Sequence, residues 1–275
     1  MKKRLDQLIV ERGLAESREK AKGAAMAGTV FVNGQRSDKP GAAVSEDAQI
    51  ELRGGTPPYV SRGGLKLMRA LTGFAVDPKG RVCLDCGAST GGFTDALLQN
   101  GAKKVYAVDV GYGQLAWSLR TDPRVVNLER TNARNLSREL VPEEISLAVM
   151  DLSFISVRLV LPAVHGLLSG DGDVLALLKP QFEAGREKVG KRGVVRSADT
   201  HLEVLQNLLD AFPGLGFTPV GLDFSPLKGP EGNIEFLCRL KKGVFDGPEL
   251  RPEQVVRAAH EALDGARAAL SRSTE

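Results

Sequence analysis

This sequence has few of the residues on which cross-links and metal sites depend. It contains three cysteines and three histidines among 275 residues. Cys83 and Cys238 lie in apolar, strand-like runs, so we expect reduced, buried thiols and a cytoplasmic protein. Cys83 and Cys86 have the spacing of half a zinc site, but no second pair and no histidine cluster accompany them. We therefore expect no metal.

Long hydrophobic runs are also missing. No apolar stretch approaches the roughly 20 residues of a membrane span, and no hydrophobic signal region follows the basic N-terminus. The net charge is only +3, so any basic surface must come from local clustering. With 42% hydrophobic and 26% charged residues, the chain has the composition of a soluble protein. Its length suits one large domain and one small domain.

The most informative stretch runs from residue 82 to residue 92, where an apolar run ends in Asp85 and a glycine-rich turn follows. Residues 93–98 then have helical spacing, which predicts a strand, a tight loop and a helix. The glycines allow a sharp turn and leave helix N-terminal amides open to a ligand. The loop lacks the G-x-G-x-x-G spacing of pyrophosphate sites, and Asp85 favours a cationic or amine-bearing ligand. An ordinary strand-to-helix turn is the alternative for this loop taken alone.

Polar residues also end three later strand patterns. Asp109 follows a buried pattern about twenty residues after the glycine loop, the place where an acid accepts hydrogen bonds from the ribose of an adenosine cofactor. Two acids at successive strand ends fit S-adenosylmethionine better than NAD. Asp151 and Lys179 end the fourth and fifth patterns, and ligands of open α/β sheets bind outside the carboxyl ends of the strands. The expected strands lie near residues 82–86, 104–110, 125–128, 146–154, 173–180, 217–224 and 233–240.

Residues 1–53 predict a separate compact unit. Two short helices flank residues 12–14, and an alternating segment over residues 29–35 ends in Asn33-Gly34, a strong hairpin signal. The first 36 residues carry eight Lys or Arg against four acids. This charge suggests binding to a phosphate backbone, and a solvated helical surface is the alternative.

The motifs of this unit resemble those of the S-four-like RNA-binding domain. The resemblance rests on Arg4-Leu5-Asp6, Gly13, Ser17-Arg18, Ala21 and the run from Gly28 to Gly34. It implies that the partner is structured RNA.

The rest of the chain divides by composition. Residues 54–61 predict a linker, because they include two prolines and two glycines. An amphipathic helix follows, and Lys66 at its beginning would by itself be taken for a surface lysine. Residues 179–196 carry six basic residues and two acids among several glycines, which suggests a mobile loop that grips phosphates. Residues 244–275 predict a linker and a C-terminal helix.

The whole arrangement resembles the TlyA family, once described as haemolysins, in which an S-four-like domain precedes an FtsJ-like ribosomal RNA methyltransferase domain. The resemblance implies a Rossmann-like, seven-stranded α/β methyltransferase sheet over residues 62–243. The motifs that carry it are Ser61–Lys66, Asp85–Thr94, Asp109–Leu115, Asp151–Ser156, Lys179–Glu183 and Gly232–Glu235. Cys86 is a departure, since relatives often carry alanine there.

The resemblance implies transfer of a methyl group from S-adenosylmethionine to a ribose 2′-hydroxyl of ribosomal RNA, with cytidine of the 16S molecule, the 23S molecule or both as the target. The expected catalytic tetrad is Lys66, Asp151, Lys179 and Glu235. Lys179 is the expected general base, and Lys66 is expected to ease its loss of a proton. The expected cofactor site comprises Asp85, Gly87, Ala88, Ser89, Gly91, Gly92, Phe93, Asp109, Asn132 and Asp151. The expected RNA-binding residues are Lys3, Arg4, Arg18, Lys20, Lys22, Arg62, Arg186, Lys188, Lys191 and Arg192.

Three other functions are left open by the sequence. Pseudouridine synthases also carry the S-four-like module, but they need no glycine loop of this kind. A ribosome-binding factor without catalysis is possible, but four polar strand ends argue against it. A membrane-lytic protein would need an apolar or strongly amphipathic segment, and none is present. We expect a monomer or weak dimer.

Overall fold

The computed structural model describes residues 2–26, 28–53 and 58–272, with side chains as far as Asp264. The N-terminal unit has two small antiparallel sheets, one of β1 and β4 and one in the order β3-β2-β5. Leu5, Ile9, Ala21 and Val30 are fully buried between its helices and strands. Its elements are β1 (Lys2–Arg4), α1 (Leu5–Glu11), α2 (Arg18–Met26), β2 (Val30–Val32), β3 (Gln35–Arg36), β4 (Ala43–Ser45) and β5 (Ile50–Leu52).

The hairpin predicted at Asn33-Gly34 is confirmed. Val32 pairs with Gln35 across a two-residue turn. Asn33 and Gly34 have φ angles of 50° and 77°. Two positive φ angles in succession are what a tight hairpin turn requires, and Asn-Gly adopts them most readily.

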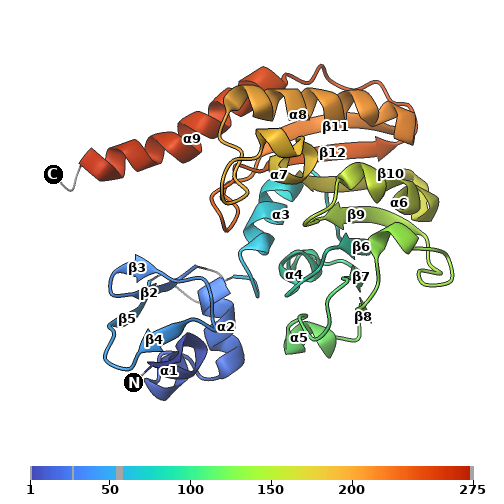
Figure 1. Cartoon of the computed structure of the whole chain (residues 1–275). Coiled ribbons are helices and arrows are strands. Elements are labelled where there is room, and N and C mark those ends of the chain that lie inside the picture. Colours follow the sequence, from blue (N-terminus) through green and yellow to red (C-terminus); the bar gives the residue numbers. More distant parts are fainter. Residues whose placement is uncertain (1, 27, 54–57, 273–275) are drawn as a thin grey trace.

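The second unit contains the predicted seven-stranded sheet. Its order is β11-β12-β10-β9-β6-β7-β8. The five strands from β10 to β8 are parallel, and β12 runs antiparallel to β10. The edge strand β11 pairs antiparallel with β12, so it points the same way as the five (Figure 1). The strands are β6 (Val82–Cys86), β7 (Lys104–Val108), β8 (Val125–Leu128), β9 (Ile145–Met150), β10 (Leu168–Leu178), β11 (Phe217–Phe224) and β12 (Phe236–Lys242).

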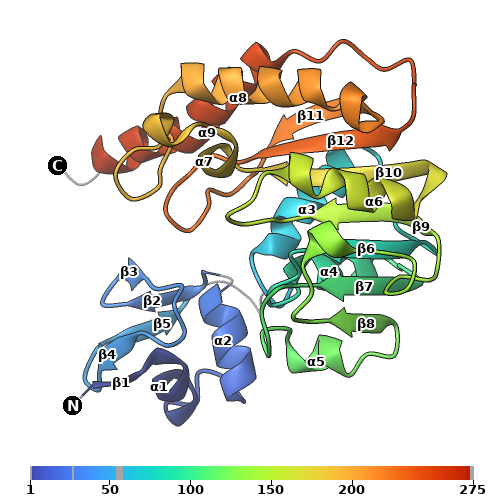
Figure 2. The same cartoon turned by 45° about the vertical axis from the view of Figure 1, so that its right-hand side comes forward.

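Helices cover both faces of the sheet (Figure 2). Residues of α3, α4 and α5 pack on one face, and residues of α6, α8 and α9 pack on the other. Successive side chains of a strand point to opposite faces of the sheet, so both faces are apolar. In β6, Cys83 packs with the residues of α3, α4 and α5, and Leu84 packs with those of α6, α8 and α9. The helices are α3 (Gly63–Gly73), α4 (Gly92–Gln99), α5 (Trp117–Arg120), α6 (Leu161–Leu167), α7 (Pro180–Glu183), α8 (Ala198–Ala211) and α9 (Pro252–Arg272).

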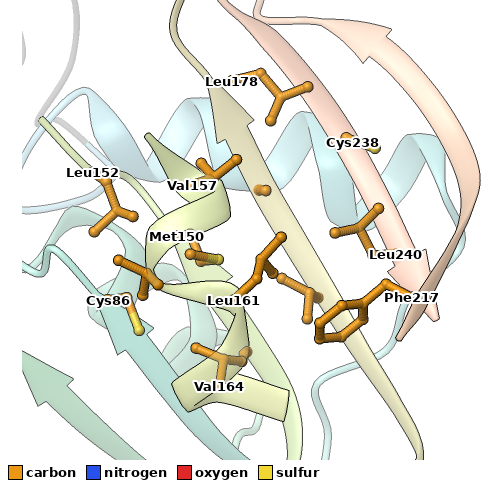
Figure 3. Packing of buried hydrophobic residues seen from close by; sticks show 14 of the residues in the cluster. Cys86, Met150, Leu152, Val157, Leu161, Val164, Leu178, Phe217, Cys238 and Leu240 are labelled. Atoms are coloured by element: carbon orange, nitrogen blue, oxygen red, sulfur yellow. The ribbon is translucent and has the colours of Figure 1, made fainter. Parts of the chain in front are cut away.

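The larger apolar core lies on the α6 and α8 face. Figure 3 shows Leu161 and Val164 of α6 near Met150 and Phe217 of the sheet. All four side chains are almost completely buried. Burying each such side chain contributes about 1.5–3 kcal/mol. This core holds the strands in the register that sets their carboxyl ends side by side.

Several predicted boundaries differ from the observed ones. β10 begins at Leu168 rather than at Asp173, and β12 begins at Phe236, so Glu235 directly precedes the last strand instead of opening it. Of the predicted linker 54–61, residues 54–57 lie outside the described residues. The first half of α9 packs through Val256 and Ala259, and its far end extends away from the sheet in Figure 1.

Candidate active site

Lys66 and Glu235 form a buried ion pair at the carboxyl edge of the sheet. Lys66 Nζ lies 2.5 Å from Glu235 Oε2, and the two side chains are 9% and 1% exposed. Leu178 of β10 pairs with Phe236 of β12, so Lys179 and Glu235 are the next residues outward on neighbouring strands. The expectation of a surface lysine, which Lys66 alone suggested, is wrong. The fold buries this side chain because α3 packs directly on the sheet.

Asp151 and Lys179 form a second ion pair. Lys179 Nζ lies 2.6 Å from Asp151 Oδ1 and also donates a hydrogen bond to Ser153 Oγ at 3.0 Å. Both residues directly follow their strands, β9 and β10, which are neighbours in the sheet. Ser153 was not predicted as a site residue. It could have been proposed from its position two residues after Asp151, the acid that follows β9.

The charges of the two pairs reinforce one another. Burial alone would lower the pKa of Lys66, but the carboxylates of Glu235 and Asp151 outweigh it and raise that pKa above its usual value. Burial alone would raise the pKa of Asp151, but Lys179 and Lys66 lower it. Both groups are therefore charged at neutral pH. The four side chains make a charge-balanced cluster of two cations and two anions.

Asp85 lies beneath the glycine loop and is completely buried. Its Oδ2 accepts a hydrogen bond of 2.7 Å from Thr94 Oγ1 on α4, while Oδ1 has no hydrogen-bond partner among the described residues. Burial raises the pKa of Asp85 to about 7. Thr94 was not predicted as a site residue, although it stands in the motif that follows the loop.

Asp109 connects the glycine loop to the next loop of the sheet edge. Its Oδ2 accepts from the backbone N–H of Ser89 at 2.8 Å, and its Oδ1 accepts from the backbone N–H of Gly111 at 2.7 Å.

Gly87 lies in the glycine loop and has a φ of 88°, and a Cβ there would lie 2.6 Å from the carbonyl oxygen of Asp151. Only glycine fits this approach. The loop is thereby packed directly against the segment that carries one of the two ion pairs.

The other residues predicted for the cofactor have different surroundings. Gly91 caps α4 with a φ of 95°, and Gly92 is the first residue of the helix. Phe93 and Ala88 are buried in the core on the α3 face, so their side chains face other protein atoms. Asn132 is exposed, and its Oδ1 accepts from the backbone N–H of Arg134.

Most of the predicted RNA-binding residues of the N-terminal unit have acidic partners. Arg4 and Arg18 lie 3.0 and 3.1 Å from Asp6, which is fully buried. Lys3 pairs with Glu11, and Lys20 pairs with Glu16. Lys22 is exposed.

The later basic residues fall into two groups. Arg62 is half-buried and lies 3.3 Å from Asp38 of the N-terminal unit. Lys188 pairs with Glu203 of α8. Arg186, Lys191 and Arg192 are exposed on the segment between α7 and α8.

Two protein families match this chain. The FtsJ-like methyltransferase family matches residues 59–242, and the S4 domain matches residues 3–50. Within the ranges that the structure describes, no helix is long and apolar enough to cross a membrane. The same ranges contain no group of three or more His, Cys, Asp or Glu residues that could hold a metal ion.

Relatives match over nearly the whole length. YqxC of Bacillus subtilis is 52% identical over 268 residues, which cover 95% of this chain and 94% of the relative. The 16S/23S rRNA (cytidine-2'-O)-methyltransferase TlyA of Mycobacterium tuberculosis is 48% identical over 239 residues, 86% of this chain and 89% of that protein. A solved structure from Streptococcus thermophilus is 46% identical, with a TM-score of 0.77 and coverage of 97% and 98% of the two chains. The chain belongs to the FtsJ-like methyltransferase family and, with its N-terminal S4 domain, to the TlyA branch of that family.

Proposed function

We propose that this chain transfers a methyl group from S-adenosylmethionine to the 2′-hydroxyl of a cytidine in 16S ribosomal RNA, 23S ribosomal RNA or both. The observation that carries the proposal is the cluster of two lysines and two carboxylates beside a glycine loop. Relatives that are named as cytidine-2'-O-methyltransferases of ribosomal RNA support the choice of substrate. Such an enzyme would act in the cytoplasm.

The residues under the glycine loop fit the proposed cofactor. Asp85 has a buried carboxyl oxygen without a partner among the described residues, and this oxygen could receive an N–H group or face a positive charge. Asp109 has carboxylate oxygens that already accept one hydrogen bond each and can accept another from a ribose hydroxyl. When bound, the cofactor supplies a methyl group on a positively charged sulfur. The chain must then supply a base and hold the hydroxyl in line.

Lys179 is the proposed base. Asp151 and Ser153 hold its Nζ from two sides at the open edge of the sheet, and its side chain is 11% exposed. After losing a proton to solvent, the amine would take the proton that the ribose hydroxyl gives up. Lys66, charged and fixed by Glu235, would hold the hydroxyl oxygen or a neighbouring phosphate. Asp151 and Glu235 orient the two lysines.

The RNA would be held mainly away from the site of reaction. The S4 domain and the exposed basic residues 186, 191 and 192 are the proposed contacts. Lysine and arginine neutralise phosphates and release counterions, so this binding should weaken as salt rises. Arg4 and Arg18 are less available than the sequence suggests, because they share Asp6.

The test is incubation of the purified protein with methyl-labelled S-adenosylmethionine and ribosomal subunits from a strain that lacks the enzyme. Label at a discrete, alkali-resistant 2′-O-methyl cytidine is the expected result. Labelled bases instead of riboses would contradict the proposed chemistry. Binding of both cofactor and subunits without transfer would indicate a ribosome-binding factor.

A further inference from the structure

Glu183 joins the two loops that carry the Asp151–Lys179 ion pair. Its Oε2 accepts a hydrogen bond of 2.6 Å from Ser156 Oγ, and its Oε1 accepts one of 2.8 Å from the backbone N–H of Val157. The side chain is 2% exposed, and the nearest cation, Arg158, is 3.9 Å away. Burying a carboxylate costs free energy unless strong hydrogen bonds compensate for the lost water. The two hydrogen bonds of Glu183 are of this strong, charge-assisted kind.

The same two loops meet at other levels as well. Lys179 contacts Asp151 and Ser153 at one end, and the rings of Phe182 and Phe154 lie 5.1 Å apart between centroids. The contacts of Glu183 with Ser156 and Val157 lie at the other end of these two segments. The residues after β10 therefore run alongside the residues after β9, and Glu183 makes the last polar connection.

Glu183 is the last residue of α7. This helix has only four residues and begins at Pro180, and Lys179 precedes it as the N-cap residue without a side-chain hydrogen bond to the helix. A single turn is not stable by itself, so contacts with the rest of the fold must hold it. Lys179 is held by β10 on one side and by α7 on the other. Loss of the contacts of Glu183 would release the second of these supports.

We propose that Glu183 is a positioning residue, which fixes α7 against residues 153–157 and so holds Lys179 Nζ at Asp151 and Ser153. The inference rests on the proposed function, because Lys179 is the proposed base there. A displacement of about 1 Å at such a group can lower a rate about 100-fold.

The first test compares Glu183→Ala with Glu183→Gln. Alanine should lower kcat about 10- to 100-fold and leave KM for S-adenosylmethionine and RNA within about 2-fold. Glutamine should keep most of the activity, because its oxygen can accept from Val157 N–H and its amide can donate to Ser156 Oγ. Glu187→Ala is the matched control, since Glu187 is an exposed acid four residues later. Equal losses in the alanine and glutamine variants would overturn the inference.

Ser156→Ala removes the hydroxyl that donates to Glu183 Oε2, together with the longer contacts of 3.3 Å that this Oγ accepts from Arg158. It should lower kcat about 3- to 10-fold, again with both KM values retained, and it serves if Glu183→Ala does not fold. An unchanged kcat in this variant would overturn the inference.

A second measurement does not depend on the methyl acceptor. Acylation of Lys179 by acetic anhydride, read by mass spectrometry, should be faster in Glu183→Ala than in the wild type and in Glu183→Gln. Unchanged acylation would refute the positioning role even if wild-type protein methylates ribosomal RNA. Faster acylation in a protein that transfers no methyl group would support the positioning role and refute the proposed function alone.

Discussion

Lys66 and Glu235 are 169 positions apart in the sequence and meet in a buried ion pair of 2.5 Å. The pair joins α3, which precedes the sheet, to the residue directly before the last strand, β12. No local segment contains both partners. This ion pair can therefore form only when α3 and the β12 edge of the sheet have come together.

Replacing Lys66 with Met should lower the free energy of unfolding by about 3–5 kcal/mol, because Glu235 is then left charged and buried. Urea denaturation measures this change. The double variant Lys66→Met/Glu235→Gln should recover a large part of the loss. Arg69→Ala is the control on the same helix, since Arg69 pairs with Asp223 while 48% exposed and should cost less than about 1 kcal/mol. Equal costs for Lys66→Met and Arg69→Ala would contradict the account of the buried pair.

Replacing Lys179 with Met should reduce methyl transfer about 100- to 10,000-fold, the range for loss of a general base. Cofactor affinity should stay within about 2-fold of the wild type. Turnover measured with saturating cofactor and subunits checks the loss of transfer, and retained turnover in Lys179→Met would remove Lys179 as the base.

Asp85 makes the stability of the protein depend on pH. Its pKa is raised from 3.8 to about 7 by burial, so its stabilising contribution is complete below about pH 4 and is lost as pH rises through 7. Asp85→Asn should therefore be more stable than wild type at pH 8, and the difference should shrink toward pH 5. A gain of about 2 kcal/mol corresponds to about 4–8 °C in Tm.

The same substitution should weaken the binding of S-adenosylmethionine, because it removes the carboxylate proposed to face the cofactor. Thermal melts at the two pH values and calorimetric titration measure the two effects. If Asp85→Asn is less stable than the wild type at pH 8, burial does not raise the pKa of Asp85 in the way described.

Gly87→Ala should destabilise the protein by about 1–3 kcal/mol and abolish methyl transfer. The added Cβ would lie 2.6 Å from the carbonyl oxygen of Asp151, on a backbone with φ of 88°. Gly80→Ala is the control, because Gly80 has φ of 72° but no atom within 4 Å of the added Cβ. It should show the cost of the backbone conformation alone and keep its activity.

Lys191→Glu should weaken RNA binding and reduce the slope of log affinity against log salt by about one, as expected for loss of a phosphate contact. Filter binding at several salt concentrations measures the slope. Arg251→Glu changes an exposed charge near the C-terminal helix and should leave the slope unchanged. A slope that Lys191→Glu does not change would exclude Lys191 from contact with an RNA phosphate.

The sequence by itself was sufficient for the features that local patterns encode. The run that ends in Asp85 predicted a strand, a loop and a helix because apolar period and glycine placement are properties of neighbouring residues. Asn33-Gly34 predicted its turn for the same reason. The strand-end positions of Asp109, Asp151 and Lys179 followed from where each apolar run stops.

The tertiary structure alone decided which side chains meet. Lys66 is buried against Glu235, Thr94 donates a hydrogen bond to Asp85, and Ser153 lies beside Lys179. The tertiary structure also paired Arg4 and Arg18 with Asp6, which a count of charges could not reveal. Burial and pairing depend on how distant segments pack and align in one sheet. A pattern of apolar residues or glycines depends only on a few neighbouring positions, so it can be read without the rest of the chain.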